Sequence, residues 1–201
     1  GIIAPDETTA GYLRECGRTV ENADFWRTDV GARLKAHHIF DASALEPQVA
    51  APHSPANAAQ VGDYNKVPVN VAYIGACTGA KLADLRMAAE VLRGCKLSSN
   101  VTLKIAPASL KDQEIAKNEG LMALFEEAGA EILPNACGIC AGYGPDRLGE
   151  DVVCISTTAR NFRGRMGAPS SKVFLGSPYT VAASAVAGYI ADPREIQGRH
   201  R

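Results

Sequence analysis

The sequence has no large net charge and no apolar run long enough to cross a membrane. Its 201 residues include 21 Lys and Arg against 22 Asp and Glu, which gives a formal net charge of -1. The basic residues are scattered along the chain, so neither nucleic acid nor an anionic membrane surface is indicated as a partner. We expect small anions or other protein chains instead.

Cysteine is scarce, and the N-terminus has no secretory signal. Six cysteines in 201 residues are too few for a disulfide-dense secreted scaffold. The opening residues Gly1 to Pro5 do not have the pattern of a signal peptide, and a start without Met is typical of a piece of a longer polypeptide. These features predict a reducing, cytoplasmic setting. The hydrophobic content of 46% is nevertheless enough for a full core.

The hydrophobic pattern divides the chain into an irregular part, residues 1–66, and a regular part, residues 67–201. The first part ends in a Pro-rich segment, residues 46–68, which predicts an extended, ordered linker that packs on a neighbouring chain or domain. In the second part, short β-branched runs alternate with helical patterns, which predicts an α/β fold with a parallel sheet. The expected strands are 69–76, 101–106, 130–133, 152–156 and 173–175, and the expected helices are 81–93, 111–128 and 179–191.

Three cysteines follow two of these predicted strands. Cys77 comes directly after the first strand, and Cys137 and Cys140 come after the third. Because ligands of an open parallel sheet collect at the carboxyl ends of its strands, we expect the three thiols at one edge. Three thiolates around one pocket predict a cubane iron–sulfur cluster in which one iron keeps a vacant position.

Two other interpretations of the Cys-x-x-Cys pair stay open. A redox pair begins a helix, whereas the Gly- and Pro-containing segment Ala141 to Asp146 cannot begin one at once. Structural zinc needs a fourth ligand, for which Cys95, Cys154 or a histidine are the candidates. We expect Cys95 to end a helix and Cys154 to lie inside a strand, both as packing residues.

Arginines follow the fourth predicted strand, in the segment Thr157 to Arg165. A guanidinium group matches a carboxylate in a bidentate manner and stays charged at any working pH. Arg160 and Arg165 are therefore candidates for holding a polycarboxylate beside the metal. The alternative is a solvated basic loop.

These motifs resemble the aconitase superfamily. Ile74 to Asp84, Cys137 to Gly142 and Arg160 to Arg165 are similar to its third, cluster-binding domain, as found in the C-terminal half of large subunits of the 3-isopropylmalate dehydratase type. Gly1 to Thr9 and Ser177 to Ser184 are similar to flanking stretches, so the resemblance covers essentially the whole chain.

The resemblance implies that Cys77, Cys137 and Cys140 hold a [4Fe-4S] cluster. It also implies that Arg160 and Arg165 bind substrate carboxylates, with Asn161 in the same substrate-binding loop. The activity implied is that of a hydro-lyase, which dehydrates and rehydrates a hydroxy di- or tricarboxylic acid. No residue of this chain is expected to act as the base, because the family's base belongs to a swivelling domain. Other subunits carrying that domain and the N-terminal domains are therefore implied as partners.

Two departures from the family pattern leave alternatives open. Gly79 and Ala159 stand where family members usually have Asn, so two polar side chains near the expected cluster are missing. The alternatives are a divergent lyase or isomerase on the same scaffold, and a non-catalytic module in which the cluster or its loss is a signal.

Overall fold

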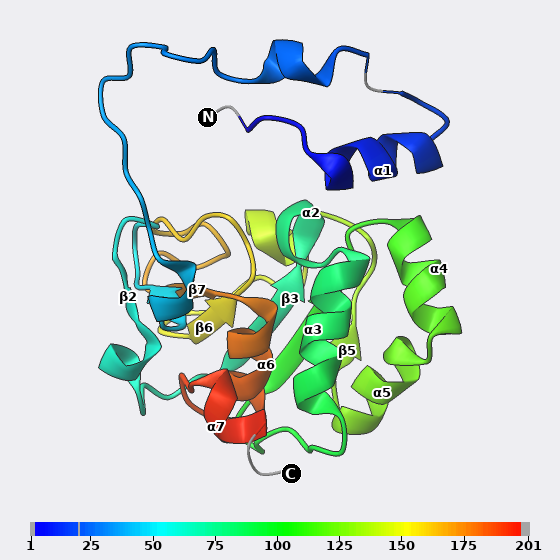
Figure 1. Ribbon diagram of the computed structural model, residues 1–201. Helices are drawn as coiled ribbons and strands as arrows, with labels where there is room; N and C mark the ends of the chain where they lie inside the picture. The colour runs from blue at the N-terminus through cyan, green and yellow to red at the C-terminus, as the bar shows by residue number, and fades with distance from the viewer. Residues whose placement is uncertain (1–2, 20, 198–201) are drawn as a thin grey trace. The chain divides into compact units, whose positions relative to one another are not determined.

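The computed structural model of this chain describes residues 3–19 and 21–197, and its contacts divide into two units, Gly1–Ala44 and Leu45–Arg201 (Figure 1). The first unit contains the helix α1 (Glu7–Glu15) and the short 3-10 helices η1 (Ala23–Trp26) and η2 (Ala42–Ala44). The carboxylate of Asp6 caps α1 by accepting a hydrogen bond from the backbone N–H of Thr9, at 2.8 Å. No residue of α1 is buried.

The second unit is built on a seven-stranded sheet in the order β2-β1-β7-β6-β3-β4-β5. Strands β3 to β7 are parallel to one another, whereas β1 runs antiparallel to both β2 and β7. The expected α/β fold with a largely parallel sheet is therefore confirmed. The strands are β1 (Gln48–Ala50), β2 (Ala58–Gln60), β3 (Val71–Gly75), β4 (Thr102–Ala106), β5 (Glu131–Ile132), β6 (Val153–Ser156) and β7 (Lys172–Gly176).

The Pro-rich segment is part of the sheet. Residues 46–68 contain β1, β2 and the 3-10 helix η3 (Val61–Tyr64), with Val49 buried against the main core. The compact unit thus begins at Leu45, ahead of the boundary at residue 66 that the hydrophobic pattern indicates. Strands of three residues between prolines are too short to show an alternation of apolar and polar residues in the sequence. Strand β1 forms because its backbone pairs with that of β7.

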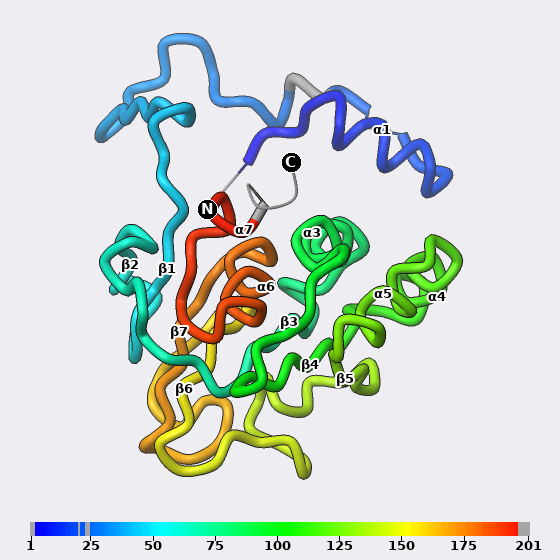
Figure 2. The backbone as a smooth tube through the Cα atoms, turned by 90° about the horizontal axis from the view of Figure 1, so that it is seen from below, coloured from blue at the N-terminus to red at the C-terminus, as the bar shows by residue number. Residues whose placement is uncertain are grey.

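All helices that follow β3 and exceed one turn pack on one face of the sheet (Figure 2). The expected helix 111–128 is two helices, because Gly120 adopts a left-handed conformation with φ of +77° between them. The expected helix 179–191 ends earlier, at Gly188 with φ of +87°. The helices are α3 (Leu82–Leu92), α4 (Leu110–Asn118), α5 (Leu121–Ala128), α6 (Pro178–Ala187) and α7 (Pro193–Gln197).

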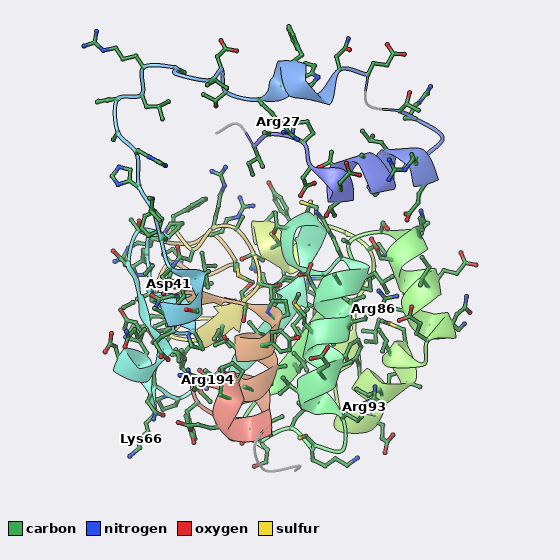
Figure 3. All side chains as sticks on the ribbon, in the orientation of Figure 1. Arg27, Asp41, Lys66, Arg86, Arg93 and Arg194 are labelled. Atoms are coloured by element: carbon green, nitrogen blue, oxygen red, sulfur yellow. The ribbon has the colours of Figure 1, made fainter. Side chains whose placement is uncertain are left out.

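Ion pairs connect neighbouring elements at the surface of this helical layer. The guanidinium of Arg86, labelled in Figure 3, donates from α3 to the carboxylate of Glu119 at 2.9 Å, just after α4. Arg194, also labelled, pairs with Asp192 at 2.6 Å and with Glu46, which joins α7 to the segment before β1. Among the helices of the described residues, none is both long and apolar enough to cross a membrane.

The opposite face of the sheet is covered by two long loops, residues 133–152 and 157–171. Side chains of the loops and strands form a second core here, which includes Tyr73, Ile139, Cys140, Leu148, Cys154 and Met166. The loops also bond to each other, since the backbone N–H of Leu148 donates to the carbonyl of Met166 at 2.8 Å. The expected segment with Cys137 and Cys140 and the expected arginine segment thus lie in these two loops, which pack together on one face of the sheet.

Candidate functional site

The strand order reverses between β3 and β6. After β3 the chain adds β4 and then β5 on one side, and β6 returns to the other side of β3. In an open parallel sheet, such a reversal leaves a crevice outside the carboxyl ends of the two central strands, where ligands bind. The segment with Cys77 leaves the end of β3, and the segment with the arginines leaves the end of β6.

The turn after β3 presents Cys77 at the surface. Cys77 lies in the one-turn helix α2 (Ala76–Gly79), directly after β3, and it is exposed. Ala76 directly before it has a φ of +66°, in the left-handed region. This conformation costs a residue with a Cβ roughly 1–2 kcal/mol, and such strain is concentrated at functional sites.

Thr157 fastens this turn to the end of β6. Its hydroxyl accepts a hydrogen bond from the backbone N–H of Gly75 at 3.0 Å and donates one to the carbonyl of Gly79 at 2.8 Å. Its own backbone N–H donates to the carbonyl of Tyr73 at 3.0 Å. The sequence analysis missed Thr157, although three hydroxyl residues in a row at the end of an apolar strand, Ser156 to Thr158, were a visible indication.

The Cys-x-x-Cys pair lies in the loop after β5. Residues Gly138–Ala141 form the 3-10 helix η4, with Cys137 exposed and Cys140 buried, and the next element along the chain is the strand β6. The side-chain amide of Asn135 anchors the start of the loop by donating to the carbonyl of Pro107 at 3.0 Å. Cys140 packs in the same apolar cluster as Ala76, the residue before Cys77.

Arg165 reaches the cysteine loop. Its Nη2 lies 4.0 Å from Sγ of Cys140, and its guanidinium carbon stands 5.5 Å from the centre of the Phe162 ring. Its Nε is buried and has no hydrogen-bond partner within the described residues. Arg160 is exposed, and the structure gives its guanidinium no hydrogen bond or ion pair among residues 3–19 and 21–197.

Asn161 lies in the interior of the second unit. Its side chain is completely buried, and its amide nitrogen donates to the carbonyls of Ala50, Ala51 and Val173 at 3.3, 2.8 and 3.1 Å. These bonds join the arginine loop to β7 and to the end of β1. This position differs from the substrate-binding one that the resemblance implied.

Tyr73 is a second residue that the sequence analysis missed. It lies under the cysteine loop with its hydroxyl buried. Burial raises the pKa of this hydroxyl far above its usual range, and negative charge on Cys140 and Cys137 acts in the same direction. An aromatic residue in an apolar strand predicts only core packing, so no sequence pattern could have marked it.

The remaining cysteines of the second unit are packing residues, as expected. Cys154 is fully buried in β6, and this burial raises the pKa of its thiol strongly. Cys95 follows α3 and its thiol donates to the carbonyl of Val91 at 3.2 Å. Across the part of the chain that the structure describes, no group of three or more His, Cys, Asp and Glu side chains is close enough to hold a metal ion as it stands.

The fold and the site together define a class, that of parallel α/β proteins with a ligand crevice at a reversal of the strand order. Residues 62–188 match the model of the aconitase family, described as aconitate hydratase. The chain therefore belongs to the aconitase family, which confirms the resemblance of its motifs.

Curated relatives agree with this assignment. The chain is 43% identical over 196 residues to the 3-isopropylmalate dehydratase large subunit 2 of Archaeoglobus fulgidus, covering 98% of this chain and 47% of the relative. It is 43% identical over 198 residues to large subunit 1 of Pyrococcus furiosus, covering 98% and 46%, and to the large subunit of Campylobacter curvus, covering 98% and 47%. The chain thus spans about half the length of the curated relatives it matches.

Proposed function

We propose that this chain is the iron–sulfur-binding part of an aconitase-like hydro-lyase. It would act on a hydroxy di- or tricarboxylic acid only together with other chains or domains. The observation that carries the proposal is the junction at the strand reversal. There the Cys77 turn and the arginine loop leave adjacent strands, are fastened by Thr157, and lie in a chain of the aconitase family.

Cys77, Cys137 and Cys140 would hold a [4Fe-4S] cluster. Three soft thiol ligands suit such a cluster and leave one of its four irons without a cysteine. Two of the three thiols are exposed, and the third belongs to the apolar cluster that also contains Ala76, the residue before Cys77. When bound, the cluster would supply a Lewis-acidic iron that polarises a substrate hydroxyl.

The arginine loop would position the substrate. Arg165 stands beside Cys140, so a carboxylate held by its planar fork would lie next to the thiol ligands. Arg160, which is exposed, would provide a second positive group at the open side of the loop. Positioning of this kind lowers a reaction barrier by as much as about 7 kcal/mol.

Partner chains would supply what this chain lacks. Its curated relatives are about twice as long, so the remaining large-subunit domains and a swivelling domain are the proposed partners. We assign no residue of this chain as the base that removes the substrate proton. The base would come from a partner chain or domain.

The test begins with anaerobic loading of the chain with iron and sulfide, followed by chemical analysis and absorbance spectroscopy. We expect about four irons and four sulfides per chain. Replacing Cys77, Cys137 or Cys140 by Ser should reduce that content to less than half, whereas Cys16→Ser, at an exposed cysteine of the first unit, should leave it unchanged.

A zinc content near one per chain, or a full cluster in all three Ser variants, would contradict the assignment. The loaded chain should then be combined with the missing subunits and assayed for dehydration of hydroxy acids. A cluster-loaded assembly without such activity would favour a non-catalytic module that senses the cluster.

A further inference from the structure

A buried hydroxyl without a partner lies beneath the cysteine loop. Tyr73 has no exposed surface, and its hydroxyl is one of three buried side-chain polar atoms, within the described residues, that have no hydrogen-bond partner. Leaving a buried hydroxyl unpaired is costly, and most such groups in proteins find a partner. The Tyr73 hydroxyl is therefore a free donor, to which a group bound under the loop would gain a hydrogen bond.

The ring of Tyr73 points along β3 toward its carboxyl end. A Cβ atom added to Gly75 would stand 2.0 Å from Cζ of the ring and 2.3 Å from its hydroxyl oxygen. The hydroxyl therefore lies level with Gly75, two residues before Cys77. The backbone of Gly75 is extended, a conformation that any residue can adopt. Glycine is required here because the Tyr73 ring occupies the space that a side chain would need.

The surroundings of this hydroxyl belong to the cysteine loop. Tyr73 packs in one cluster with Ile139 and Cys140, and it lines a small cavity of about 150 Å³ with Ala136, Gly138 and other residues of that loop. Besides Tyr73, the polar side chains of the lining are Tyr143, which is 71% exposed, and Asp146, whose carboxylate is already paired with Lys104 at 2.8 Å. Cys140, which packs in the same cluster as Tyr73, is the proposed cluster ligand that brings sulfur to this side of the sheet.

We infer that the Tyr73 hydroxyl donates a hydrogen bond to a sulfur atom of the cluster held by Cys137 and Cys140. The inference rests on the proposed function. A hydrogen bond to a cluster sulfur stabilises the extra negative charge of the reduced state, so it raises the reduction potential. It also holds the Cys137–Cys140 loop in place, which makes Tyr73 a positioning residue.

The experiment compares the loaded wild-type chain with Tyr73→Phe, which removes only the hydroxyl. The matched control is Tyr143→Phe, because Tyr143 lines the same cavity but is 71% exposed. Resonance Raman spectra in H2O and D2O should show a deuterium shift of the Fe–S stretching bands that is larger in the wild type and in Tyr143→Phe than in Tyr73→Phe. A reductive titration followed by EPR should give a more negative midpoint for Tyr73→Phe alone.

The unloaded proteins provide an independent measurement. Because the hydroxyl has no partner before the cluster binds, Tyr73→Phe should be at least as stable to urea as the wild type without cluster, and the stability it gains on loading should be smaller. Equal deuterium shifts and equal midpoints in the loaded wild type and Tyr73→Phe would overturn the inference and leave the proposed function intact. A wild-type chain that takes up no iron would overturn both.

Discussion

At the scale of single residues, the arginine loop contains side chains in very different surroundings. Arg165 is partly buried, lies beside the Cys140 thiol and stacks near Phe162, whereas Arg160 and Arg163 are exposed. A guanidinium that is held in place by its neighbours loses less entropy when it binds an anion. Arg165 is therefore the strongest candidate for the residue that fixes a carboxylate.

We expect Arg165→Lys to weaken dicarboxylate binding at least tenfold, or about 1.4 kcal/mol, because lysine keeps the charge but loses the planar fork. The measurement is a titration of the reassembled, cluster-loaded enzyme. Arg160→Lys should weaken binding less, and Arg163→Lys should change it by less than about twofold. Wild-type affinity in Arg165→Lys would mean that the loop is structural.

Asn161 shows how a residue of the same loop can serve the fold. Its amide donates to three backbone carbonyls, so Asn161→Ala removes three hydrogen bonds and leaves buried acceptors unpaired. We expect the free energy of unfolding to fall by roughly 2–4 kcal/mol, measured by urea denaturation. Asn161→Asp should be worse, because a carboxylate would face the same carbonyl oxygens.

The control for this experiment is Asn118→Ala at the exposed end of α4, which should stay within about 0.5 kcal/mol of the wild type. A stable Asn161→Ala protein with weakened substrate binding would instead restore the role that the family resemblance implied.

At the scale of elements, the junction of β3, α2 and β6 explains one departure from the family pattern. A Cβ atom at Gly79 would stand 2.3 Å from the backbone carbonyl oxygen of Thr157 and 2.5 Å from its side-chain hydroxyl. Position 79 therefore has no room for the usual Asn while Thr157 fastens the turn. The missing amide reflects close packing at this junction.

We expect Gly79→Ala to destabilise the protein by about 1–3 kcal/mol, and Gly79→Asn by more, because the turn must move away from Thr157. Cluster content should fall with it, since Cys77 lies in the displaced turn. Urea denaturation and iron analysis provide the measurements. Gly62→Ala is the control, because a Cβ atom at that position meets nothing within 4 Å. Equal stability and equal iron content of Gly79→Ala and Gly62→Ala would contradict the prediction and show that the junction can relax.

At the scale of the whole molecule, the two units differ in what they bury. In residues 3–19 and 21–44, none of the side chains that the structure describes is buried, and several large apolar ones are more than half exposed, among them Phe25, Trp26, Val30, Ile39 and Phe40. Exposed apolar surface of this extent is unusual in a monomer and marks an interaction site. The curated relatives that the chain matches are about twice as long as this chain.

We therefore expect the isolated chain to be inactive and to form a defined assembly with the missing domains, as measured by sedimentation. Limited proteolysis of the chain alone should cut within residues 1–44, and addition of the missing domains should protect these sites. The rate of cutting within residues 45–197 is the internal control. A well-behaved monomer that converts a hydroxy acid would contradict this prediction.

The sequence by itself determined the class of the fold and indicated the family. Alternation of β-branched runs with helical patterns predicted the parallel α/β sheet, because buried strands and amphipathic helices each leave a local periodicity. The placement of the segments with Cys77, Cys137 and Arg165 after three of the predicted strands predicted a common edge, since parallel strands end on the same side. The sequence motifs also indicated the aconitase family, which the comparisons confirm.

Only the tertiary structure decided the surroundings of each residue. The reversal between β3 and β6, the paired loops on one face and the strand β1 depend on contacts between distant segments, which leave no local pattern. For the same reason, neighbouring loop residues have opposite positions, with Arg160 exposed and Asn161 buried. Thr157 gains its importance from a partner that lies far away in sequence, since it is 82 residues from Gly75. The unpaired hydroxyl of Tyr73 gains its importance from the cysteine loop that packs over it.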